Sequence, residues 1–156
     1  MTIRLSIDSR EAALAELIAR SSNADVPEDV QATMRVFGVV QICGYIERSI
    51  EVVILARLEK RAHPRLLEFV KSYFKKGTNF RCSVIKSFLE RFDTSWARKY
   101  QDFIDENDDV SELVNSAYTL RNQAAHGNSI NLSDRRLNDF FEGAKKAVQA
   151  VIDSTG

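Results

Sequence analysis

A long apolar pattern with helical spacing runs through the first half of this chain, in which glycine and proline are scarce. The 156 residues include six glycines and two prolines, a composition that favours long helices over a turn-rich β fold. Between Pro27 and Arg61, apolar residues recur every three or four positions, and further apolar residues widen the stripe beyond one face. We therefore expect one long helix that is central in a bundle or that also packs against a partner subunit.

The remaining segments carry helix patterns with start and stop signals, so the predicted fold class is all-α. The predicted starts of the other helices are Asp8, Pro64, Asn79, Thr94, Val110 and Ser133. The acidic segment 105–109 is predicted to be a linker, and Gly127 is the expected left-handed cap at the end of the sixth helix. Together these signals predict a single-domain up-and-down helical bundle over 1–156, with an N-terminal helix and linker over 1–26 and a core bundle over 27–153.

The charge of the chain is balanced overall but unevenly distributed. The net charge is zero, which argues against a general nucleic-acid coat protein. Eight basic and two acidic residues lie between Lys71 and Lys99, whereas 102–112 has six acidic and no basic residues. The basic region can meet a phosphate backbone locally, and its candidate RNA contacts are Lys75, Lys76 and Arg81. The alternative is that these residues belong to solvated helix faces.

The sequence shows no sign of a membrane-spanning, secreted or disulfide-rich protein. No window approaches the roughly 18 unbroken apolar residues of a membrane span, and the first residues lack the apolar core of a signal peptide. Two cysteines, Cys43 and Cys82, imply no disulfide framework, and we expect both to be small buried residues. A cytoplasmic protein without membrane contact is therefore expected.

The segment Arg121-Asn122-Gln123-Ala124-Ala125-His126-Gly127 has the clearest chemical potential. The imidazole of His126 can transfer protons near neutral pH, and the guanidinium of Arg121 can hold a phosphate by two hydrogen bonds. Asn122 and His126 share one helix face because they are four residues apart. An ordinary helix end is the alternative, since cations are favoured near a helix C-terminus.

The chain resembles the HEPN superfamily, and within it most nearly the RiboL-PSP-HEPN group. The resemblance rests on the segment containing Tyr45, Glu47 and Arg48, a basic helical middle, and the Arg-Asn-x3-His-Gly core from Arg121 to Gly127. It extends over roughly Val36 to Ile152. It implies a HEPN-type bundle with one long central helix and additional short helices.

The resemblance also implies a function, because many HEPN domains are metal-independent endoribonucleases of toxin–antitoxin, phage-defence and CRISPR-linked systems. By matching position, Arg121, Asn122 and His126 are the expected catalytic residues, without cofactor or metal. Cleavage through the 2′-hydroxyl of RNA would leave a 2′,3′-cyclic phosphate, and the protein is expected to act as a homodimer whose motifs face each other. The expected partners are RNA and an antitoxin or defence-system protein.

Three residues of the long helix are secondary candidates. Glu47 is predicted to fix Arg121 or His126 by a salt bridge, with a solvent-facing Glu47–Arg48 pair as the alternative. Tyr45 can stack on a base or pack in the core.

One position departs from the pattern of some HEPN toxins. These have a modifiable tyrosine two residues after the histidine, where this chain has Asn128. A non-catalytic HEPN-like module for dimerisation, nucleotide binding or partner docking is the competing interpretation. A metal-dependent nuclease or hydrolase is a weaker third interpretation.

Overall fold

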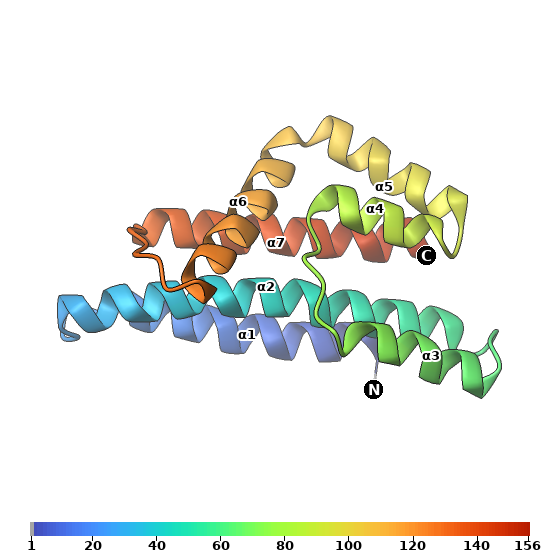
Figure 1. Cartoon of the computed structure of the whole chain (residues 1–156), viewed down its shortest axis with the longest axis horizontal. Helices are drawn as coiled ribbons and strands as arrows, with labels where there is room; N and C mark the ends of the chain where they lie inside the picture. The colour runs from blue at the N-terminus through green and yellow to red at the C-terminus, as the bar shows by residue number, and fades with distance from the viewer. Residues whose placement is uncertain (1) are drawn as a thin grey trace.

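The structure, a computed structural model, describes residues 2–156, and this part of the chain forms seven α-helices and no strand (Figure 1). The all-α prediction is therefore confirmed. The helices are α1 (Ile3–Ser21), α2 (Glu28–Leu58), α3 (Pro64–Phe74), α4 (Cys82–Glu90), α5 (Thr94–Glu106), α6 (Asp108–Ala125) and α7 (Asp134–Thr155).

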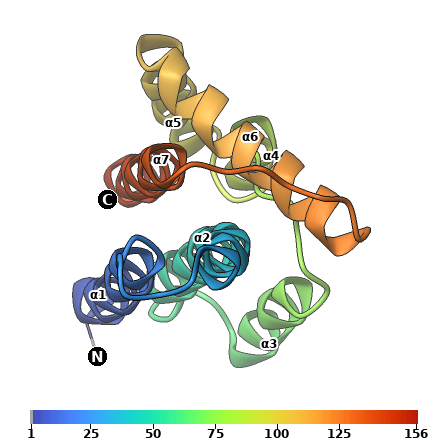
Figure 2. The same cartoon turned by 90° about the vertical axis from the view of Figure 1, so that its left-hand side faces the viewer.

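The long helix predicted from the apolar pattern is α2, whose 31 residues make it the longest element. It packs against α1, α3, α6 and α7 (Figure 2). A helix with neighbours on several sides must be apolar on more than one face, and ten of its residues are buried. The central position in the bundle thus accounts for much of the wide stripe, although Val30, Phe37 and Val40 remain exposed.

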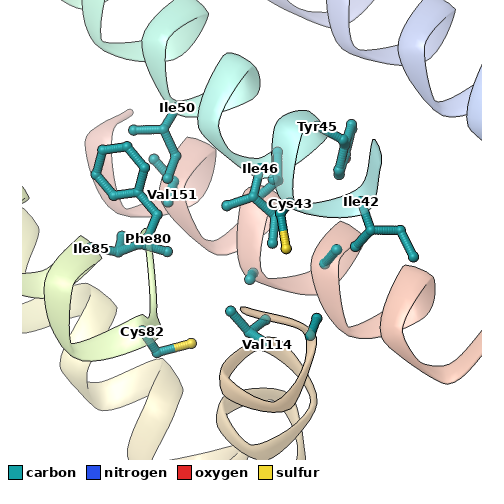
Figure 3. Close-up of a cluster of buried hydrophobic side chains, with 14 of the residues drawn as sticks. Ile42, Cys43, Tyr45, Ile46, Ile50, Phe80, Cys82, Ile85, Val114 and Val151 are labelled. Atoms are coloured by element: carbon teal, nitrogen blue, oxygen red, sulfur yellow. The ribbon is translucent and has the colours of Figure 1, made fainter. Parts of the chain in front are cut away.

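The core joins α2 to segments far away in the sequence (Figure 3). Ile46, Ile50 and Cys43 of α2 lie beside Val151 of α7 and Val114 of α6. Phe80, which precedes α4, is fully buried with them.

Both cysteines are free and buried as expected, and burial raises the pKa of the Cys43 thiol to about 12. None of the described helices is long and apolar enough to cross a membrane.

Several predicted helix starts are wrong because a different residue caps the helix. The first helix begins at Ile3, where the hydroxyl of Thr2 accepts from the backbone N–H of Leu5, so Asp8 lies inside it. Asp93 rather than Thr94 caps α5 through the N–H of Ser95, at 2.7 Å.

Two further boundaries differ around α4 and α6. Helix α4 begins at Cys82, with Arg81 rather than Asn79 as its N-cap, and the Asn79 carboxamide instead accepts from an arginine of another helix. The predicted linker 105–109 is reduced to Asn107, since α5 continues to Glu106 and α6 begins at Asp108. The starts at Pro64 and, through the Ser133 cap, of the last helix are confirmed.

The close approach of α6 to α7 at Gly143 makes a stability prediction. A Cβ added there would lie 2.8 Å from the Cβ of Leu113. We expect Gly143→Ala to lower the free energy of unfolding by about 1–2 kcal/mol, because overpacking outweighs the roughly 0.5–1 kcal/mol that alanine gains over glycine in a helix. Gly44→Ala is the matched control, since nothing lies within 4 Å of its added Cβ. Urea denaturation measures both, and equal stabilities would contradict the close approach.

Candidate active site at the end of α6

The carboxyl end of α6 presents the predicted histidine to solvent. His126 is the C-cap residue and is exposed. Gly127 follows with φ of +75°, a left-handed conformation that glycine adopts without steric cost. The N–H of Gly127 donates to the carbonyl of Ala124, and the N–H of Asn128 donates to that of Gln123, both at 3.0 Å. This is the Schellman arrangement, and it fixes the direction in which the chain leaves His126.

Arg121 lies more than one turn before His126 and is held by three neighbours. Its Nη1 donates to Oε1 of Glu47 on α2 at 3.3 Å. Its Nη2 donates to Oδ1 of Asn79, in the segment between α3 and α4. The guanidinium carbon also lies 5.3 Å from the centre of the Tyr118 ring, within the range of a cation–π contact. Three parts of the chain therefore define the position of one guanidinium.

The Arg121–Glu47 pair is only partly shielded from water. The side chains are 25% and 22% exposed, respectively. Burial raises the pKa of Glu47 above its ordinary value of 4.5, and the positive charge of Arg121 partly opposes that rise. The predicted salt bridge between Glu47 and Arg121 is confirmed, and the alternative Glu47–Arg48 pair is not formed.

Arg48 does not take part in this pair. It forms a salt bridge with Glu51 one turn later on α2, in which the arginine is 53% exposed and the glutamate 14%. Asn122 is half-buried and its backbone carbonyl accepts the N–H of His126 at 3.1 Å. The structure thus brings Arg121 and Glu47 into contact and puts Asn122 and His126 on the adjoining helix end.

The predicted RNA contacts lie in different environments. Lys75 and Lys76 are exposed at the end of α3. Arg81 is bound to α6, where it donates to the carbonyl of Asn115 at 3.2 Å and to the hydroxyl of Thr119 at 3.0 Å. It therefore holds the segment before α4 against the helix that carries the motif.

Tyr45 is a packing residue, contrary to the idea that it stacks on a base. It is 4% exposed, its hydroxyl donates to Oε1 of Glu11 at 2.6 Å, and its ring meets Phe141 edge to face. The place of Tyr45 on α2 explains this. Its side chain lies on the buried face that contacts α1 and α7, and Glu47 lies on a different face of the helix.

A small cavity of about 170 Å³ adjoins the ion pair. Glu47 and Arg48 of α2 line it on one side, and Phe74, Thr78 and Phe80 line it on the other. The segment that supplies Asn79 thus forms one wall of a hollow beside Glu47, the partner of Arg121. Sequence reasoning assigned Asn79 to a helix cap, and only the fold shows that it contacts Arg121.

The comparisons with known proteins give one match. The model of the family described as RiboL-PSP-HEPN matches residues 5–155, which is nearly the whole chain. No curated protein and no solved structure matches this chain.

The raised pKa of Glu47 predicts a pH dependence of stability. Because the folded state binds a proton on this carboxylate more readily than the unfolded state, stability contributed by Glu47 is lost as pH rises through its folded pKa. Relative to Glu47→Gln, which cannot titrate, the wild type should therefore gain stability as pH falls from neutral toward 4.5. Urea denaturation of both proteins across this range measures the difference. A difference that does not change with pH, or that changes in the opposite direction, contradicts the prediction.

Proposed function

This chain belongs to the RiboL-PSP-HEPN family of the HEPN superfamily, and we propose on this basis that it is a metal-independent endoribonuclease. The observation that best supports the proposal is the arrangement around α6. A partly exposed guanidinium is held by two other parts of the chain, and the same helix ends in an exposed imidazole. In the cell, the resemblance favours a toxin or a phage-defence effector, with an antitoxin or a defence-system protein as a further partner.

Arg121 is proposed to bind the scissile phosphate. A guanidinium has five N–H donors, and Glu47 and Asn79 use one N–H of each Nη atom. The second N–H of each Nη remains to hold two phosphate oxygens, as arginine commonly does. The positive charge then stabilises the pentacoordinate transition state, on which negative charge develops. Glu47 positions the guanidinium in advance of binding.

His126 is proposed to transfer the protons. The imidazole takes the proton of the 2′-hydroxyl, the 2′-oxygen forms a bond to phosphorus, and the bond from phosphorus to the 5′-oxygen breaks. The leaving 5′-oxygen takes a proton from solvent or from the imidazole of a second copy. The products are a 2′,3′-cyclic phosphate and a 5′-hydroxyl. Asn122 orients the imidazole or binds the phosphate.

A dimer is proposed because α2 leaves an apolar stripe exposed beside the site. Val30, Phe37 and Val40 are 44%, 50% and 37% exposed. At about 100° per residue they lie on one side of the helix, which continues to Glu47. A second copy packed on this stripe would bring its own α6 motif close to the first.

The competing candidate is a non-catalytic module that dimerises, binds a nucleotide or docks on a partner. It is favoured by the fact that both Nη atoms of Arg121 already have protein partners. A purely structural arginine would have the same contacts, so activity measurements must separate the two.

Cleavage assays test the catalytic proposal. Purified protein in EDTA should cut RNA, and the same sequence made of DNA should remain intact because it lacks the 2′-hydroxyl. His126→Ala should lower the rate by about 10²–10⁴-fold, and Arg121→Ala should lower it by about 10²–10³-fold. Gel electrophoresis and end-group analysis would show the cyclic phosphate.

The other histidine provides the matched control. His63 is exposed and caps α3, where its Nδ1 accepts from the N–H of Arg65 at 3.2 Å. His63→Asn retains a favourable cap and should leave cleavage unchanged. Equal activity of wild type and His126→Ala would favour the non-catalytic module.

The dimer has a separate test. Phe37→Asp places a charge in the proposed interface and should raise the dimer Kd by at least about 30-fold, the loss typical of a buried interface anchor. Leu5→Asp is the control, because Leu5 on α1 is 62% exposed and lies outside the α2 stripe. Sedimentation velocity measures both variants. An unchanged dimer in Phe37→Asp, or a monomeric wild type that cleaves RNA, would contradict the proposed arrangement.

A further inference from the structure

Helix α3 is unusual in the bundle because none of its residues is fully buried. Its inner side, with Val70, Tyr73 and Phe74, packs partly against the core. Phe69, on the outer face of α3, is 72% exposed, and Leu66, which lies on the same side of the helix as Tyr73, is 57% exposed. Burying a side chain such as phenylalanine typically stabilises a protein by about 1.5–3 kcal/mol, so the fold leaves this contribution unused at Phe69. Large apolar side chains gathered on a surface mark an interaction site.

Basic residues surround the exposed ring. Arg65 lies one turn before Phe69 on the same face of α3, and Lys75 and Lys76 follow the end of the helix. Segment 60–81 contains seven basic residues and one acidic residue, in a chain of zero net charge. Among the described residues, Lys71 pairs with Glu68 at 2.7 Å, whereas no salt bridge is formed by Arg65, Lys75 or Lys76. The charge is therefore available to an anionic partner.

This surface continues into the candidate active site. Helix α3, segment 75–81 and the carboxyl end of α6 lie on one side of the molecule, which faces the viewer in Figure 1 and is on the right in Figure 2. Segment 75–81 runs directly from the end of α3 to Asn79, which contacts Arg121. A chain-like anion lying on α3 can thus reach Arg121 along one continuous path.

We propose that the outer face of α3 binds the RNA strand outside the cleavage site. An unpaired base stacks on the Phe69 ring, and neighbouring phosphates lie against Arg65, Lys75 and Lys76. This combination of an aromatic platform with cations is how proteins commonly hold single strands. A duplex offers no free base face inside its stack, so the surface selects unpaired RNA. The inference rests on the proposed ribonuclease function.

Binding to a short fluorescein-labelled oligouridylate tests this inference. The measurement uses full-length His126→Ala protein in EDTA, so that the probe is not cut, and records fluorescence anisotropy. Adding Phe69→Ala should weaken binding roughly tenfold, because base stacking contributes strongly to single-strand affinity, whereas Phe69→Trp should preserve it. Arg65→Ala and Lys76→Ala should each reduce the slope of log K against log salt by about 0.7, the value for one contact with a single strand. Duplex RNA of the same length should not respond to Phe69→Ala.

Matched variants separate a binding role from loss of structure. Leu5→Ala removes an apolar side chain of α1 that is 62% exposed, and Arg20→Ala removes an exposed cation from the same helix. Both should bind the oligouridylate as the parent protein does. Phe69→Ala should have the urea midpoint of the parent, because the ring is largely in solvent.

The outcomes distinguish this inference from the proposed function. If wild-type protein cleaves RNA but Phe69→Ala changes neither the Kd of the probe nor KM, the inference fails and the ribonuclease stands. If no RNA is cleaved but binding depends on Phe69, the binding surface stands and the ribonuclease fails. Failure of the parent protein to bind the probe overturns the inference. Recruitment to phosphatidylserine vesicles through Phe69, without an effect on the oligouridylate, also overturns it in favour of a membrane surface.

Discussion

The burial of α2 on several sides is the constraint on which the rest of the structure depends. It contacts α1, α3, α6 and α7, and its apolar residues form the part of the core that joins both halves of the chain. Between residues 38 and 54, where these neighbours meet, most of its residues are buried or half-buried. Glu47 lies where one apolar face ends, only 22% exposed. A carboxylate in that position requires a partner, and α6 supplies Arg121.

The ion pair positions the site more than it stabilises the fold. Both side chains keep contact with water, and partly exposed pairs contribute at most about 1 kcal/mol. Its geometric effect is larger, because it joins residues 74 positions apart in the sequence. Asn79 adds a second fixed contact from the segment before α4, and Arg81 holds that segment to α6. A guanidinium constrained in this way loses less conformational entropy when it meets a phosphate.

The sequence predicted those features whose causes are local or periodic. The extent of α2, the left-handed Gly127 and the place of His126 at the end of α6 follow from apolar spacing and from the rules of helix ends. Glu47 was also identified, since a charge within an apolar run needs a partner. Asn79 was missed because its role depends on a contact across 42 residues, and a cap is the ordinary role of asparagine before a helix. Tyr45 was ambiguous for a similar reason, because its neighbours Glu11 and Phe141 come from the two ends of the chain.

The helices of the bundle differ in how many of their residues are buried. Helices α2 and α7 carry most of the buried residues, whereas α3 has none and packs on α2 and, through Tyr73 and Phe74, on Phe88 of α4. The free energy needed to displace a helix with so few buried residues is small. Helix α3 leads directly into the segment that holds Asn79. A ligand on the outer face of α3 would therefore lie next to the segment that carries Asn79, whereas Glu47 belongs to α2. In this arrangement one partner of the guanidinium belongs to the stable part of the fold, and the other belongs to the part most open to a ligand.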